Sequence, residues 1–152
     1  MLGVLSNDEI ISVLKSNSIG RIGCTDGKRL YVVPVTYAFD GKYIIAHSRP
    51  GLKTDMMRSH SEVCFEVDKI ITLTNWKSVV AWGTYEEIED AEEKKNAMMF
   101  FINSVLHLDI SESAVLHHDL PSKSAMPHKT GEIPTIVYRI LLKEMTGRFE
   151  LK

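Results

Sequence analysis

The sequence has little cysteine and no long hydrophobic run. Its two cysteines, Cys24 and Cys64, lie in separate apolar segments with strand-like patterns. Two cysteines in a chain of 152 residues do not form a disulfide framework, so we expect both to be reduced residues of the core. Because no apolar run approaches the length of a transmembrane helix, the sequence predicts a protein without a membrane partner.

Patterns typical of metal and nucleic-acid sites are also absent. No Cys-x-x-Cys or His-x-x-x-His spacing occurs, which argues against a metal site. The formal net charge is −2 and no segment is rich in lysine and arginine, which argues against nucleic acid as a partner. Residues 1–6 lack the basic flank and long apolar core of a signal peptide, so we expect a cytoplasmic protein.

The composition is that of an ordinary folded domain. Apolar residues make up 44% of the chain and charged residues 25%. A chain of this length buries a sizeable core, and we expect a single domain spanning residues 1–152.

Alternating apolar and polar residues predict a sheet. Its six strands cover residues 19–25, 31–37, 42–46, 62–67, 76–88 and 135–149. Helices are expected after the capping box of Ser6 and Glu9, over residues 54–60 and over residues 91–107. Short connections favour antiparallel pairing, and such a sheet closes best as a small barrel. The predicted fold is therefore mainly β (α+β), a six-stranded antiparallel barrel with flanking helices.

Three local features add to this prediction. Gly83 interrupts the fifth predicted strand and indicates a bulge or a bend. Arg139 lies on the last predicted strand, where we interpret it as a surface residue. Residues 108–131 show no regular pattern and are interpreted as a mobile segment.

The segment from Leu30 to Lys53 carries the strongest functional signal. The Asp40-Gly41 pair predicts a tight hairpin between the second and third predicted strands. The loop from His47 to Lys53 then combines an imidazole, a hydroxyl, two cations and a glycine just before a helix. This combination is typical of an anion site, and phosphate is the expected anion. The alternative is a solvated loop with an ordinary surface lysine.

A family resemblance rests on segments that occur in a fixed order. They are Val33-Pro34-Val35-Thr36-Tyr37, His47-Ser48 with Gly51-x-Lys53, Trp76-x-Ser78-Val79 with Gly83, and Tyr138-Arg139-Ile140 with Thr146-Gly147-Arg148. With these segments the chain resembles the FMN-binding split-barrel proteins of the pyridoxamine 5′-phosphate oxidase-like superfamily. Within that superfamily it is most similar to the flavin-nucleotide-binding branch that includes nitroimidazole-resistance proteins.

The resemblance implies a split β-barrel flavoprotein that forms a homodimer, with FMN bound in clefts between the subunits. It also implies a set of FMN-binding residues on four segments. They are Val33, Pro34, Val35 and Thr36 along the ring, Ala46, His47 and Ser48 near the ring and ribityl chain, Gly51, Lys53 and Thr54 at the phosphate, and Trp76, Ser78 and Val79 from the other subunit.

The function implied by the resemblance is that of an FMN-dependent oxidoreductase acting on a small-molecule substrate, with nitroreductase-like activity as one form. The alternative is a non-catalytic protein that binds flavin or another cofactor. His47 is the candidate catalytic residue, and the competing interpretation is a histidine bonded to a backbone carbonyl at the end of a strand. True pyridoxamine 5′-phosphate oxidases have an arginine directly before the phosphate lysine. Leu52 stands there in this chain, so that reaction is not expected.

Overall fold

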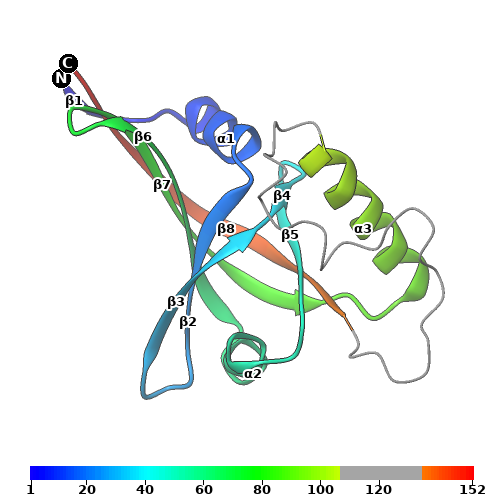
Figure 1. The fold of residues 1–152 in the computed structure, drawn as a ribbon. Helices are drawn as coiled ribbons and strands as arrows, with labels where there is room; N and C mark the ends of the chain where they lie inside the picture. The colour runs from blue at the N-terminus through cyan, green and yellow to red at the C-terminus, as the bar shows by residue number, and fades with distance from the viewer. Residues whose placement is uncertain (107–134) are drawn as a thin grey trace.

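The computed structural model describes residues 1–106 and 135–152, so the predicted mobile segment at 108–131 lies outside the described residues. The described chain forms one antiparallel sheet and three helices (Figure 1). In chain order the elements are β1 (Leu2–Val4), α1 (Asn7–Ser16), β2 (Ile19–Thr25), β3 (Leu30–Thr36), β4 (Ala38–Phe39), β5 (Tyr43–Ser48), α2 (Leu52–Ser59), β6 (Glu62–Thr72), β7 (Asn75–Glu87), α3 (Ala91–Leu106) and β8 (Ile136–Leu151).

The sheet is an open barrel. Its strand order is β3-β2-β6-β7-β8-β5-β4, and β1 pairs with the end of β8. All pairings are antiparallel, and the two ends of the order, β3 and β4, do not pair with each other. The predicted α+β split-barrel class is therefore confirmed. The sheet has eight strands where the sequence predicted six, because the short strands β1 and β4 carry no periodic pattern of their own.

The predicted hairpin between the strands over 31–37 and 42–46 is wrong in its pairing. The turn at Asp40-Gly41 joins β5 to the two-residue strand β4, whereas β3 pairs with β2 at the far end of the sheet. At Tyr37 the chain passes from β3, at one end of the strand order, to β4 at the other end. The amide of Tyr37 donates to the carbonyl of Ser18 at 2.8 Å. A continuous run of β-branched and aromatic residues hides this corner in the sequence.

Two predicted boundaries also move. β5 continues to Ser48 and α2 begins at Leu52, so the predicted loop from His47 to Lys53 shortens to residues 49–51. β6 continues to Thr72 through a segment that looked irregular in sequence, because β7 pairs with it along its length.

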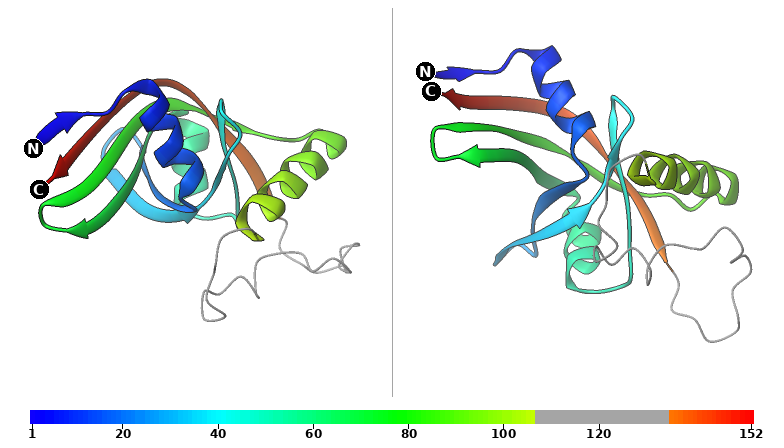
Figure 2. Two further views of the ribbon diagram at one scale, coloured as in Figure 1. Left: turned by 90° about the horizontal axis from the view of Figure 1, so that it is seen from above. Right: turned by 45° about the horizontal axis from the view of Figure 1, so that its top comes forward.

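Two helices add to the core on the inside of the curled sheet, beside the inward-facing residues of the strands. α1 contributes an apolar face that includes Val13 and Leu14, and α2 adds Met56 and Met57. A second, smaller core lies where α3 packs on β4, β5 and β8. In Figures 1 and 2, β4 and β5 lie between α1 and α3, so this hairpin is the wall shared by the two cores.

The predicted irregularity at Gly83 is confirmed as a bulge. The pairing of β7 with β8 shifts register between Trp82 and Gly83. A Cβ atom at Gly83 would lie 2.3 Å from the carbonyl oxygen of Leu141, so the close approach of the two strands requires glycine.

Tyr37→Phe is expected to destabilise the fold by about 1–3 kcal/mol, the cost of leaving a buried polar group unpaired. The Tyr37 hydroxyl donates to the carbonyl of Leu14 at 2.7 Å, in the last turn of α1. Denaturant unfolding measures the loss. Tyr31→Phe is the matched control, because Tyr31 is a half-buried residue whose hydroxyl makes no hydrogen bond in the described structure. Equal effects of the two substitutions would contradict this role for Tyr37.

Candidate functional site

β3 presents the four predicted ring contacts on two different faces. Val33 and Val35 alternate toward the interior, and Val35 belongs to the main core. Pro34 and Thr36 are exposed on the outer face of the sheet. Since β3 is an edge strand that pairs only with β2, the missing N–H of Pro34 is tolerated there. A flat ligand along β3 would therefore meet the backbone and the side chains of Pro34 and Thr36.

The loop before α2 is held by its own residues. The Thr54 hydroxyl donates to the carbonyl of Gly51 at 2.9 Å and accepts from the amide of Gly51 at 3.0 Å. Its single proton is thus used within the loop, and Thr54 is fully buried. Gly51 has an extended backbone, and a Cβ atom there would meet nothing within 4 Å among the described residues. The side of Gly51 on which a Cβ atom would lie, next to the start of α2, is therefore open.

Lys53 lies inside the first turn of α2 rather than before the helix, which corrects the sequence-based boundary. It is half-buried, and burial lowers the pKa of its ammonium group, while Cys24 on β2 acts in the opposite direction. No carboxylate in the described part of the chain lies within ion-pair distance of Lys53. A partly desolvated cation without a counterion, at the positive end of a helix dipole, favours a bound anion.

β5 divides its three predicted residues between the two cores. Ala46 faces the main core, and Ser48 lies on the same face by strand alternation. The ring of His47 faces α3 instead, where it meets Phe101 edge-on with the ring centroids 5.1 Å apart. The candidate catalytic histidine therefore lies on the opposite face of the strand from Ala46.

β7 likewise separates its predicted residues. Trp76 donates from Nε1 to Glu150 at 3.2 Å, and Ser78 donates to Glu66 at 3.1 Å. Val79 is 0% exposed and belongs to the main core. Within one chain, β2 and β6 lie between β3 and β7, so the two groups of predicted residues are about 14 Å apart at the usual strand spacing. The strand order of the described chain therefore keeps Trp76 and Ser78 apart from the predicted residues of β3.

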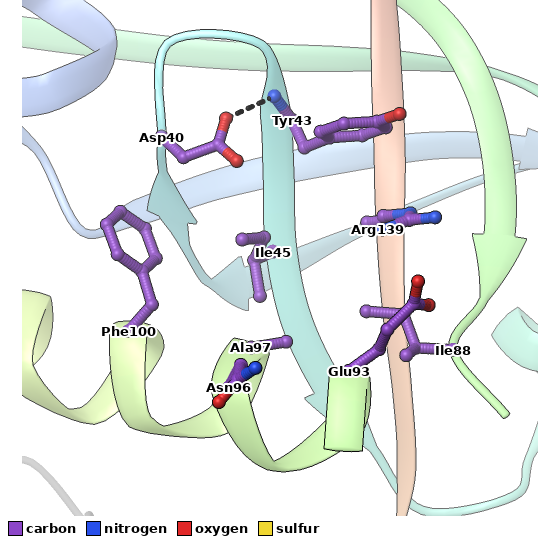
Figure 3. Close-up of a pocket in the computed structure, with 9 residues that line it drawn as sticks. All are labelled: Asp40, Tyr43, Ile45, Ile88, Glu93, Asn96, Ala97, Phe100 and Arg139. Atoms are coloured by element: carbon purple, nitrogen blue, oxygen red, sulfur yellow. Dashed lines mark hydrogen bonds between the residues drawn. The ribbon is translucent and has the colours of Figure 1, made fainter. Parts of the chain in front are cut away.

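Sequence reasoning missed a cavity of about 340 Å³ between α3 and the hairpin of β4 and β5 (Figure 3). None of the predicted site residues lines it. Arg139, which the sequence suggested was a surface residue, forms part of its wall and bonds to Glu86 at 2.8 Å. The signal in the sequence was faint, because the lining comes from four separate segments.

The part of the chain that the structure describes carries neither a metal site nor a membrane-spanning helix. No group of three His, Cys, Asp or Glu side chains in 1–106 and 135–152 is arranged to hold a metal ion. Among the helices that the structure describes, none is long and apolar enough to cross a membrane.

The open barrel with a cationic helix N-terminus at its edge places the chain in the split-barrel class of folds. A sequence profile of the pyridoxamine 5′-phosphate oxidase family matches residues 6–149, and the chain belongs to this family. The resemblance inferred from the sequence is confirmed at this level.

Solved structures agree with the fold. An FAD-binding protein from Mesorhizobium loti is 29% identical, with a TM-score of 0.76 over 100% of this chain and 98% of its own. A putative 5-nitroimidazole antibiotic resistance protein from Bacteroides thetaiotaomicron is 20% identical, with a TM-score of 0.72 over 98% of this chain and 87% of its own, and supports the fold alone. An uncharacterized protein of Rhizobium meliloti is 35% identical over 85 residues, which are 56% of each chain and thus little more than half of that relative.

We expect Lys53→Met to stabilise the ligand-free protein, because it removes a partly buried ammonium that has no counterion. The lowered pKa means that the folded state of the wild type releases the proton below the ordinary lysine value of 10.5. The free energy of unfolding of the wild type therefore increases as the pH rises through the lowered pKa. The difference in this free energy between Lys53→Met and the wild type becomes smaller over the same range.

Thermal unfolding as a function of pH measures this difference. The control is Lys28→Met, because Lys28 lies in the exposed turn between β2 and β3. This substitution should leave the midpoint of thermal unfolding unchanged. A lower midpoint for Lys53→Met than for wild type would show that the lysine contributes to stability in the absence of ligand.

Proposed function

We propose that this protein is a flavin-dependent oxidoreductase that holds the phosphate of FMN at the N-terminus of α2. The observation that carries the proposal is the half-buried Lys53, whose ammonium has no carboxylate partner in the described structure. The open space above Gly51 gives an anion access to the first amides of the helix. An ordinary surface lysine would be solvated and would not carry a desolvation cost.

The choice of a flavin is supported by the relative from Mesorhizobium loti, which is described as FAD-binding. FMN and FAD share the isoalloxazine ring, the ribityl chain and its phosphate. Lys53 would bind this shared phosphate, so the proposed site could bind either cofactor. Of the two, we propose FMN. Identification of the released cofactor by mass distinguishes the two.

A bound flavin and the protein would have different roles at such a site. A bound flavin would supply the electron transfer to a small-molecule acceptor, for example a nitroaromatic compound. The chain would supply position and charge: Lys53 and the first amides of α2 for the phosphate, and the edge of β3 with Pro34 and Thr36 for the ring. The residues present fit this group, since the cation is uncompensated and the glycine leaves room.

A second candidate function is a flavin-binding protein without turnover. It is favoured by the position of His47, whose ring packs against Phe101 on the side of α3. Leu52, 44% exposed, also stands at the start of α2 where a second cation would strengthen phosphate binding. Reduction of the bound flavin by NADH or NADPH, followed by reoxidation by an acceptor over many cycles, would exclude this candidate.

We also propose that the protein is a homodimer whose second copy covers the outer face of the sheet. Strand pairing aligns Val32, Gly23, Cys64 and Trp82 in one row across β3, β2, β6 and β7. Val32 is 65% exposed and Trp82 41% exposed, although both are large and apolar. A second copy on this face would also bring its own Trp76 and Ser78 to the β3 edge, which one chain cannot do.

Protein purified after expression should be yellow, and FMN should rebind after removal. Lys53→Ala should weaken FMN binding by about 1–3 kcal/mol, the scale of hydrogen bonds to charged groups. Fluorescence titration with FMN measures the dissociation constant, and Lys28→Ala serves as the matched control. A colourless protein that takes up neither FMN nor FAD would refute the proposal, and an unchanged affinity in Lys53→Ala would place the phosphate elsewhere.

Val32→Lys should convert the dimer to a monomer and weaken flavin binding with it, because a charge would be buried in the interface. Size-exclusion chromatography with light scattering gives the mass of each variant. Met99→Lys is the control, since Met99 is 53% exposed on α3, away from the outer sheet face. A wild-type protein that is monomeric with flavin bound would contradict the dimer proposal.

A further inference from the structure

The cavity between α3 and the hairpin of β4 and β5 has an apolar floor. Ile45, Ile88 and Ala97 form it, and all three are buried in the smaller core. The rings of Tyr43 and Phe100 form parts of the wall (Figure 3). The cavity is open to solvent, because Asp40, Glu93 and Asn96 in its lining are exposed, and its volume of about 340 Å³ suits only a small ligand.

Acidic groups are in excess around this floor. The guanidinium of Arg139 is already matched, because its Nη2 donates to Glu86 at 2.8 Å and its Nε donates to the same carboxylate at 3.3 Å. Arg139 also stacks on Tyr43, with 4.7 Å between Cζ and the ring centroid. It is therefore held in place by groups of the protein itself.

The two carboxylates that line the cavity form no ion pair of this kind, although Glu93 is close enough to Arg139 to contribute to the raised pKa of its guanidinium. In the described structure neither Asp40 nor Glu93 lies within ion-pair distance of a cation. Oδ1 of Asp40 accepts the amides of Lys42 and Tyr43 at 2.8 and 2.7 Å, which fixes the carboxylate and leaves Oδ2 without a partner. Figure 3 shows Asp40 and Glu93 at different sides of the apolar floor. An organic cation entering the cavity thus finds a carboxylate on more than one side.

We propose that this cavity binds a small amphipathic amine, with its apolar body on Ile45 and Ala97 and its ammonium at one of the two carboxylates that lie on either side of this floor. Aromatic rings and aliphatic side chains accommodate the body, and the unpaired carboxylates select the positive charge. The site is separate from the proposed flavin site and does not depend on it.

Three ligands of similar shape and different charge test the proposal. Phenethylammonium should bind, 2-phenylethanol should bind more weakly, and 3-phenylpropanoate should bind least. Calorimetry on the full-length protein, as purified with whatever cofactor it carries, gives the dissociation constants. Chemical-shift changes at the amides of residues 43–45 and 96–100 locate the site.

Glu93→Gln should raise the dissociation constant of phenethylammonium by about twofold to fivefold, the range for exposed ion pairs. It should leave the dissociation constant of 2-phenylethanol unchanged. Asp40→Asn should act in the same direction, because its side-chain oxygen still accepts the two backbone amides and preserves the turn. Glu92→Gln, next along α3 and outside the cavity, is the matched control. Equal binding of amine and alcohol, preferred binding of the acid, or no binding at all would overturn the proposal.

Discussion

The split barrel depends on one corner, the point where the chain leaves β3 and enters β4 at Tyr37. Three contacts hold that residue. Its amide donates to the carbonyl of Ser18, and its hydroxyl donates to the carbonyl of Leu14. Its ring meets the ring of Phe65 edge-on, with the centroids 4.9 Å apart. The Leu14 carbonyl belongs to the last turn of α1, where helix carbonyls lack internal partners. The same side chain thus completes a helix end and separates the two edges of the sheet.

Stability and binding make opposite demands at the start of α2. A lysine in the first turn of a helix opposes the helix dipole, and partial burial adds a desolvation cost. Neither cost is offset by an ion pair in the described structure. The neighbouring residues, in contrast, are satisfied internally, since Thr54 and Gly51 exchange two hydrogen bonds. An uncompensated cation in the first turn of α2, beside a loop whose polar groups are satisfied, is the feature on which the proposed anion site rests.

The sequence predicted the parts of this structure that depend on local chemistry. The capping box of Ser6 and Glu9 and the turn at Asp40-Gly41 were found because each depends on neighbouring residues, and the bulge at Gly83 was indicated by a glycine inside a strand pattern. The corner at Tyr37 was missed, since its partners Ser18 and Leu14 are about twenty residues away in sequence. The cavity at Arg139 was missed for the same reason. The face of the sheet on which a side chain lies was also hard to predict. The sequence grouped Ala46 with His47 and Ser78 with Val79, whereas the two members of each pair lie on opposite faces because side chains alternate along a strand.

The arrangement of helices explains why a single chain leaves its predicted site incomplete. α1 and α2 fill the inside of the curled sheet, and α3 covers β4 and β5, so the outer face of β3, β2, β6 and β7 receives no helix from the described chain. That face carries an ion-paired group of Arg21, Glu66 and Asp68 between its exposed apolar side chains. Such a mixture is typical of an interface, in which polar pairs set the register and apolar groups exclude water. Two strands separate β3 from β7 within one chain, so in the proposed homodimer it is the second copy that would bring a Trp76 side chain to the β3 edge.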